Sequence, residues 1–294
     1  MEAAAILAEY RARLESGARA AQLEAGENPC LELMTMLLAA TRELWPALDL
    51  EERRRELASL FSWGVPNQRA LEVLAAHAPL VECGAGMGYW SALLRVRGVD
   101  VLAYDAAPPG VEANAYHAFG RGPWTAIERD DSMHAARRHG DRTLVLCWPP
   151  FDDDRASYAV LRAYRGDTLV YVGERGEGAM GSVRFHRELG LNWSVEEEVP
   201  LPNWPRLRDR LLVYRRNAVR RPLRDRDRCF ECHRFIATGA IGRCDACFAR
   251  KPSALALQVG RHRVEYLQEM LDAMPAERRR ALEESPNRID AKRS

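Results

Sequence analysis

LVECGAGMGYW, residues 80–90, is the stretch that decides the fold of this chain. An apolar run leads into Glu82, and Gly84, Gly86 and Gly88 then follow at a spacing of two residues before the helical pattern SALLRVRG. A strand, a glycine turn and a helix in this order form the ligand-binding corner of a doubly wound α/β sheet. Glycine permits positive φ angles and lets the backbone approach a ligand closely. The stretch therefore predicts a Rossmann-like sheet with a ligand site after its first strand.

The glycine spacing argues against a dinucleotide as that ligand. The dinucleotide fingerprint is G-x-G-x-x-G, whereas the third glycine comes one residue early here. Glu82 would repel a pyrophosphate but suits a cationic amino group, and Asp105, after a second strand, is placed to accept both ribose hydroxyls. S-adenosylmethionine carries an ammonium, a sulfonium and an adenosine but no phosphate, so it fits both acids. The alternative is a glycine-rich turn with an acid that caps a helix.

On these residues the chain resembles the class I S-adenosylmethionine-dependent methyltransferases. Glu82-x-Gly84-x-Gly86-x-Gly88 matches their first motif, and Asp105 matches their second. The resemblance implies that Asp130 meets the adenine amino group, although its neighbour Asp131 leaves the register open by one residue.

A more specific likeness is to a group of largely uncharacterised methyltransferase-like proteins. It is carried by FSWGVPN (61–67), LVLCWPPFDD (144–153), YRGDTLVYVGE (164–174) and LPNWPRLRDRLLVYRR (201–216). The likeness covers residues 60–216 and implies the fold and the cofactor, whereas it does not imply the methyl acceptor.

Strand and helix patterns alternate through this region. Strands are predicted at 79–83, 100–104, 124–128, 143–147, 168–172, 193–199 and 210–215, and helices at 67–77, 89–96, 111–118, 131–138, 154–163 and 181–189. The alternation predicts a mostly parallel sheet covered by helices on both faces. The last two strands predict an antiparallel addition at one edge, which is the seven-stranded layout that the resemblance implies.

Six segments are predicted along the chain. They are a helical N-terminal cap (1–60), an S-adenosylmethionine-binding domain (61–216), an Arg-rich linker (217–228), a four-cysteine zinc finger (229–250), C-terminal helices (251–286) and a tail (287–294). Interspersed aspartates make the linker typical of a solvated connector, and a strip that contacts phosphates is the alternative.

Cys229, Cys232, Cys244 and Cys247 form two C-x2-C pairs separated by eleven residues. Two such pairs place four thiolates in the tetrahedral arrangement that zinc accepts. Because cysteines fill all four positions, we expect a closed structural Zn²⁺ site rather than a catalytic one. Two redox-active pairs are the alternative interpretation.

Trp148, Pro149, Pro150 and Phe151 follow the predicted fourth strand. The run is close to the [D/N/S]-P-P-[Y/F/W] signature of methyltransferases that act on planar amino groups, where a polar side chain and a proline carbonyl hold the NH2. Trp148 takes the polar position and offers only an N–H donor, which weakens the case for amino-group methylation. The run still indicates a rigid, aromatic-walled pocket, and a strand-ending turn with Trp148 in the core is equally open.

Three further residues are candidates for the site. Glu174 ends the predicted fifth strand and is the candidate general base, with the orientation of a loop as its alternative role. Trp63 and Asn67 precede the first strand and are candidates to fold over the cofactor, and a corner between helices is the alternative. The glycine-rich residues 173–181 are a candidate substrate lid.

Composition limits the classes of function. The chain has 294 residues, with 43 basic and 42 acidic side chains, so its net charge gives no general attraction to nucleic acid. No apolar run approaches the ~20 residues that span a bilayer, so no membrane partner is expected. The N-terminus has an acid where a signal peptide needs a basic region, which predicts a cytoplasmic protein.

The prediction is therefore an S-adenosylmethionine-dependent methyltransferase of unknown acceptor, either a small molecule or a macromolecule, with a zinc module that recruits a substrate or partner. A nucleic-acid methyltransferase that docks through the linker and the finger is one alternative. A non-catalytic scaffold with the methyltransferase fold is the other.

Overall fold

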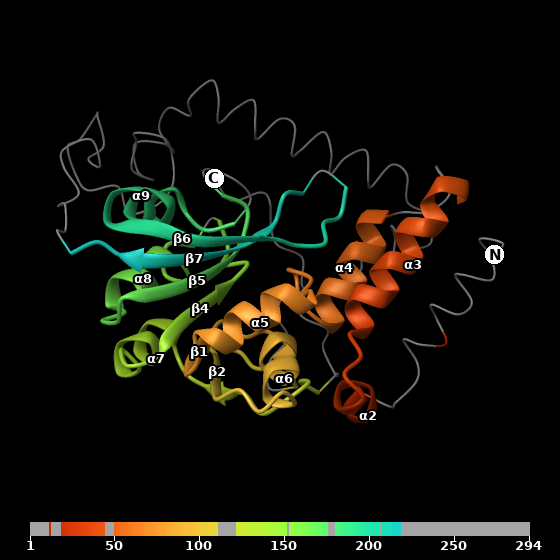
Figure 1. Ribbon diagram of the computed structural model, residues 1–294, viewed down its shortest axis with the longest axis horizontal. Helices are drawn as coiled ribbons and strands as arrows, with labels where there is room; N and C mark the ends of the chain where they lie inside the picture. The colour runs from red at the N-terminus through yellow and green to blue at the C-terminus, as the bar shows by residue number, and fades with distance from the viewer. Residues whose placement is uncertain are drawn as a thin grey trace, which may run out of the picture. The chain divides into compact units, whose positions relative to one another are not determined.

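The stretch that begins at Leu80 forms an interior strand of a seven-stranded sheet in a computed structural model of the protein (Figure 1). The structure describes residues 12, 19–44, 50–110, 122–151, 153–175, 180–205 and 207–218. All of them belong to one of the two compact units of the chain, Met1–Asp225 with Ala237–Ile241.

The strands lie in the order β3-β2-β1-β4-β5-β7-β6. Their bounds are β1 (Leu80–Cys83), β2 (Val101–Asp105), β3 (Glu128–Arg129), β4 (Thr143–Cys147), β5 (Thr168–Gly173), β6 (Trp193–Pro200) and β7 (Arg210–Arg216). The first five run parallel, and β7 lies antiparallel between β5 and β6. The predicted sheet with an antiparallel final pair is confirmed.

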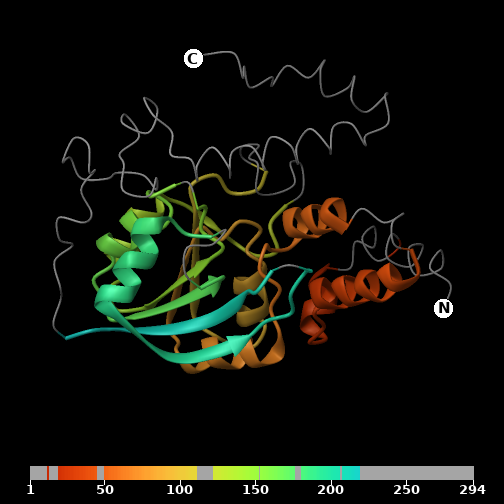
Figure 2. The same cartoon turned by 90° about the horizontal axis from the view of Figure 1, so that it is seen from above.

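Helices cover both faces of this sheet, as Figures 1 and 2 show. Two of them, α5 (Gln68–Ala76) and α6 (Tyr89–Arg95), contribute side chains to the apolar core on one face. The core on the other face contains side chains of α7 (Ser132–Arg138), α8 (Tyr158–Ala163) and α9 (Val183–Asn192). Parallel strands covered on both faces are largely apolar, and every residue of β1 and β5 is buried.

Three helices precede the sheet: α2 (Arg19–Glu24), α3 (Pro29–Leu44) and α4 (Leu50–Leu60). Leu33 of α3 and Leu57 of α4 are buried in the same core as α5 and α6. The Tyr89 hydroxyl of α6 also joins the start of α3 to the sheet domain by hydrogen bonds. It accepts from the Cys30 amide at 3.3 Å and donates to Asn28 Oδ1 at 2.8 Å. The N-terminal helices therefore share the core of the sheet.

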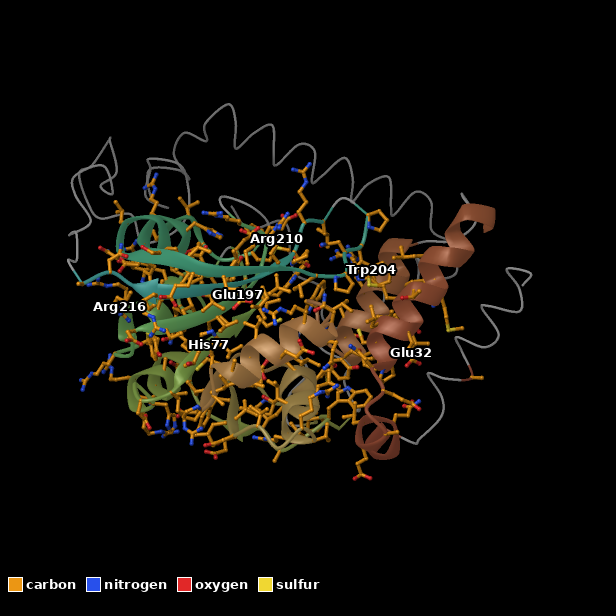
Figure 3. The ribbon with its side chains drawn as sticks, viewed as in Figure 1. Glu32, His77, Glu197, Trp204, Arg210 and Arg216 are labelled. Atoms are coloured by element: carbon orange, nitrogen blue, oxygen red, sulfur yellow. The ribbon has the colours of Figure 1, made fainter. Side chains whose placement is uncertain are left out.

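One edge of the sheet is formed by β6, whose side chains alternate between more buried and more exposed positions. Glu197 and Glu198 pair with Arg69 and Arg210 at 2.7 Å each. Figure 3 shows Arg210 and Arg216 at opposite ends of β7 and Trp204 in the connection between β6 and β7. Charged, ion-paired side chains on an edge strand discourage pairing with another chain.

Two predicted boundaries are wrong. The third strand was expected at 124–128, but only Glu128 and Arg129 pair with β2. Trp124 packs instead on Phe61, with ring centroids 5.0 Å apart, and its indole N–H donates to the Leu60 carbonyl at 2.7 Å. The helix expected from residue 154 begins only at Tyr158.

Several predicted segments lie outside the described residues. They are the helix at 111–118, residues 1–11 and 13–18 of the N-terminal cap, nearly all of the linker, the zinc finger, the C-terminal helices and the tail. Within the part of the chain that the structure describes, no helix is both long and apolar enough to cross a membrane.

Candidate functional site

A cavity of about 300 Å³ lies at the carboxyl ends of β1, β2 and β4. Its walls come from the end of α4 and the following turn, the glycine turn after β1, the tip of β2, the start of α7 and the loop after β4. The lining residues are Ala58, Phe61, Ser62, Trp63, Glu82, Cys83, Gly84, Ala85, Gly86, Met87, Asp105, Ala106, Ala107, Ser132, Cys147, Trp148, Pro149, Pro150, Asp153 and Ala156. Its size lies at the lower end of the range for small-molecule sites.

The three glycines of the turn all have positive φ: 75° at Gly84, 54° at Gly86 and 70° at Gly88. Residues other than glycine rarely adopt such φ angles. A Cβ atom at Gly84 or Gly86 would meet no heavy atom within 4 Å, whereas one at Gly88 would meet the Ile127 side chain at 3.0 Å. The first two glycines therefore leave backbone open toward the cavity, and the third permits close packing.

Glu82 lies at the inner wall of the cavity and is only 2% exposed. Its Oε2 accepts a hydrogen bond of 2.5 Å from the Ser91 hydroxyl in α6. Burial raises the pKa of this carboxyl to about 7, although the bond from Ser91 acts in the opposite direction. A buried carboxyl of this kind gains most from a ligand that brings a positive charge.

Asp105 connects the glycine turn to the tip of β2. Its Oδ2 accepts from the Gly86 amide at 2.8 Å, and its Oδ1 accepts from the Ala107 amide at 2.9 Å. Each carboxylate oxygen has a further lone pair for a hydroxyl donor. The two bonds fix the carboxylate beside the open backbone of the turn.

The charge of the cavity lining is one-sided. Glu82, Asp105 and Asp153 are acidic, and among the described residues of the lining there is no lysine, arginine or histidine. A phosphate or pyrophosphate in this cavity would lack a cationic partner and would meet three acids. The lining favours a ligand that is neutral or positively charged.

Two residues predicted to contact the cofactor do not line the cavity. Asp130 forms an ion pair with Arg138 at 3.1 Å, and its Oδ1 lies 3.5 Å from His134 Nδ1. Its neighbour Asp131 caps α7 by accepting from the Met133 amide. Ser132 is the residue of this segment that borders the cavity.

Asn67 is the second of these residues. Its side chain accepts from the Ala70 amide at 2.9 Å, which makes it the N-cap of α5, and it donates to the Pro200 carbonyl at 3.0 Å. Both ends of the amide are therefore used to fix the start of a helix. The structure places Asn67 in the corner that was the alternative interpretation.

Trp63, by contrast, does border the cavity and stacks on Trp148, with ring centroids 5.4 Å apart and planes inclined by 23°. The guanidinium of Arg54 lies over both rings, at 5.5 and 5.8 Å. The turn can approach β4 and β5 this closely because residue 64 is a glycine. A Cβ at Gly64 would lie 2.7 Å from Val172 Cγ1.

The loop after β4 forms the opposite end of the cavity. Trp148 has a φ of 51°, and its indole N–H donates to Asp209 Oδ2 at 3.0 Å. The Pro149 carbonyl accepts from the Gly181 amide at 2.6 Å. In the resembled signature, the side chain at the position of Trp148 and the carbonyl at the position of Pro149 hold the amine. Here both groups form hydrogen bonds within the protein instead.

Phe151 and Glu174 are not among the lining residues. Phe151 is 45% exposed. Glu174 Oε1 accepts from the Arg208 amide at 2.9 Å, so this carboxylate is bonded to the segment before β7. The structure brings Trp148, Pro149 and Pro150 to the cavity and leaves Phe151 and Glu174 out of its wall.

Two charged residues beside the Trp148 end of the cavity, acidic Asp209 and basic Arg54, were not predicted from the sequence. Asp209 is 3% exposed, and burial raises its pKa to about 7. In the sequence it is one charge among several in LPNWPRLRDR, a pattern typical of a solvated connection. The one available signal was an acid directly before an apolar strand.

The described cysteines show no sign of nucleophilic function. Burial raises the thiol pKa values of Cys30 and Cys83 far above their usual range and that of Cys147 to about 12. In the described ranges no cluster of three or more His, Cys, Asp or Glu residues is arranged to hold a metal ion. The four cysteines of the predicted zinc site lie outside those ranges.

Comparison with known proteins finds methyltransferases among the solved structures. Magnesium protoporphyrin IX methyltransferase from Synechocystis PCC 6803 with bound S-adenosylmethionine is 12% identical, with 61% of this chain and 96% of that chain covered at a TM-score of 0.34. The M1A22 tRNA methyltransferase TrmK of B. subtilis is 10% identical, with 74% and 92% covered at 0.31. The 23S rRNA methyltransferase ErmE is 15% identical, with 52% and 69% covered at 0.32.

No protein-family model and no curated protein sequence matches the chain. Similarities this distant do not identify an activity.

The buried carboxyl of Glu82 makes stability depend on pH. Below pH 4.5, the usual pKa, both folded and unfolded states hold the proton; between 4.5 and about 7 only the folded state holds it. Wild-type stability should therefore fall as pH rises through this window. Glu82→Gln, which cannot ionise and still accepts from Ser91, should be more stable than wild type at about pH 8, by about 3 kcal/mol at most.

Urea unfolding across this window measures the effect. The difference between variant and wild type should approach its smallest value at the acid end. Parallel profiles at all pH values would show that Glu82 does not change protonation on unfolding.

Proposed function

We propose that this chain is an S-adenosylmethionine-dependent methyltransferase. The observation that carries the proposal is the charge of the cavity lining. Three acidic side chains and an open glycine turn line the cavity, and no basic side chain occurs among the described lining residues. S-adenosylmethionine is a cationic adenosine derivative without phosphate, so its charge and its hydrogen-bonding groups fit this lining. The resemblance of the motif at Glu82–Gly88 and Asp105 to the first two class I motifs agrees with the proposal.

Each part of the cofactor has a matching group in the lining. Glu82 would attract the ammonium, and the open backbone at Gly84 and Gly86 leaves room for the methionine portion and the ribose. Asp105 would accept the ribose hydroxyls while it keeps its bonds to the protein. The adenine would lie toward Ala107 and Ser132, which border the cavity beyond Asp105.

The acceptor would enter from the end formed by Trp63, Trp148, Pro149 and Pro150. Methyl transfer is an in-line displacement, so the enzyme must hold a nucleophile about 3–3.5 Å from the methyl carbon. This end belongs to the same cavity as the glycine turn. A continuous cavity supports an active transferase over a scaffold with a blocked site.

The remaining parts of the proposal concern the C-terminal region. We propose that Cys229, Cys232, Cys244 and Cys247 hold one structural Zn²⁺ and that this module recruits the substrate or a partner. A nucleic-acid acceptor that docks through the linker 217–228 and the finger is the alternative proposal for that partner.

Binding of S-adenosylhomocysteine, the demethylated product, tests the proposal by isothermal titration calorimetry. Wild type should bind it, and Asp105→Asn should weaken binding by about 10- to 100-fold, the range expected for lost charge-assisted hydrogen bonds. NAD should not compete, because its pyrophosphate would face the acids.

Asp100→Asn is the matched control for this experiment. Asp100 lies just before β2, at the opposite end of the strand from the cavity, and pairs with Arg142 at 2.8 Å. The control should bind like wild type. If wild type failed to bind S-adenosylhomocysteine, or if both variants bound equally well, the assignment of the cavity would be wrong.

Metal analysis tests the zinc site. The purified, reduced protein should contain one zinc per chain, and the pair Cys229→Ser and Cys244→Ser should lose it, since the removal of two thiolates leaves an incomplete tetrahedron. Cys30→Ala, which removes a buried cysteine from α3, should keep the metal. Substoichiometric zinc in the reduced wild type would contradict the site.

A further inference from the structure

Trp148 has a backbone conformation that requires support. Its φ of 51° lies in the left-handed region, where bulky side chains are uncommon. Residues in such conformations persist only when their surroundings hold them, and they gather at binding sites. The ring of Trp148 also forms part of the cavity wall, so whatever holds this residue shapes the cavity.

The side chain that fixes the indole is Asp209, sixty-one residues further along the chain. Asp209 Oδ2 accepts from the indole N–H at 3.0 Å, and the residue is only 3% exposed. Its Oδ1 is buried and has no hydrogen-bond partner in the described residues. Burying a carboxyl with one oxygen unsatisfied costs stability, so its place beside Trp148 calls for a reason other than packing.

The connection between β6 and β7 is built to present this carboxyl. Asn203 Oδ1 accepts from the Asp209 amide at 2.6 Å, and Asn203 Nδ2 donates to the Asp209 carbonyl at 3.1 Å. The same amide group also donates to the Leu201 carbonyl at 2.8 Å. Asn203 thus joins the two ends of the connection between β6 and β7 by hydrogen bonds and fixes the backbone of Asp209.

On its other side, the indole of Trp148 is covered by Trp63. The rings stack, and Arg54 lies over both. The indole is thereby held by a hydrogen bond at its edge and by a ring on its face. Two independent restraints leave it one orientation.

We propose that Asp209 is a positioning residue for the acceptor end of the cavity, where it holds the Trp148 indole in place and keeps its N–H turned away from the substrate. The proposal depends on the proposed function only in naming this end the acceptor side. With the Trp148 donor bonded to Asp209 and the Pro149 carbonyl bonded to Gly181, the loop presents an aromatic surface. Acceptor selection at this wall would then follow shape and stacking rather than an amine-holding hydrogen bond.

Nuclear magnetic resonance of ¹⁵N-labelled protein tests this inference through the Trp148 indole N–H resonance, which is assigned by its loss in Trp148→Phe. Asp209→Leu should shift that resonance strongly upfield and increase its solvent exchange, because the acceptor is lost. Asp209→Asn retains an oxygen acceptor and should keep the resonance close to its wild-type position.

A pH titration supplies a second readout. The pKa of Asp209, raised to about 7 by burial and by the charge of Glu174, should appear as a movement of the Trp148 resonance in wild type and be absent in Asp209→Asn. The other charged or titratable groups around Asp209 are Arg54, Tyr171 and Cys147, and burial raises the pKa values of the tyrosine and the thiol further above neutrality. Glu82, across the cavity, titrates in the same range and would remain in Asp209→Asn.

Glu188→Gln is the matched control. Glu188 in α9 is 1% exposed, also has a buried carboxylate oxygen without a hydrogen-bond partner among the described residues, and does not line the cavity. Its substitution should leave the Trp148 resonance unchanged. S-adenosylhomocysteine affinity should change by less than about twofold in Asp209→Asn, since Asp209 does not border the cofactor side.

The outcomes separate the two proposals. A Trp148 resonance that neither moves in Asp209→Leu nor titrates in wild type overturns the positioning role. If Asp209→Leu fails to fold, the wild-type titration and its comparison with Asp209→Asn still test the positioning role of Asp209. Failure of wild type to bind S-adenosylhomocysteine would overturn the proposed function while leaving the Trp148 result intact.

Discussion

The hydrogen bond from the Gly86 amide to the Asp105 carboxylate, 2.8 Å long, is the contact on which the site depends. It joins the turn after β1 to the tip of β2, and the Ala107 amide completes the pair at the other carboxylate oxygen. The turn can meet Asp105 in this way because its glycines adopt positive φ. One acid therefore shapes the loop and faces the cavity at the same time.

The other end of the cavity is built by segments far apart in the sequence. Trp63 comes from the turn after α4, Trp148 from the loop after β4 and Asp209 from the residue before β7. Gly64 brings the first of these segments within contact distance of Cys147 and Val172. Helix α4 is thus part of the site as well as of the core, since it supplies Ala58 in the wall and leads into the turn that carries Trp63.

Local pattern predicted the strand, turn and helix at 80–95 well, because they are contiguous in the sequence and the backbone geometry of the turn requires its glycines. The positions of Trp124 and Asp209 depend on tertiary contacts, which the local sequence pattern does not reveal. Trp124 left the predicted third strand because its ring packs on Phe61 and Tyr89. Asp209 looked like a solvated charge, because its burial depends on Trp148, which is distant in the chain.

Under the proposed function, the cavity selects a positive charge through Glu82. The most direct test of this selection compares affinities for S-adenosylhomocysteine and its analogue lacking the amino group, in wild type and in Glu82→Gln, at about pH 8, where Glu82 is mostly ionised. Wild type should prefer the amino compound by about 10- to 100-fold, and the variant should lose most of that preference. An equal preference in both proteins would contradict the account.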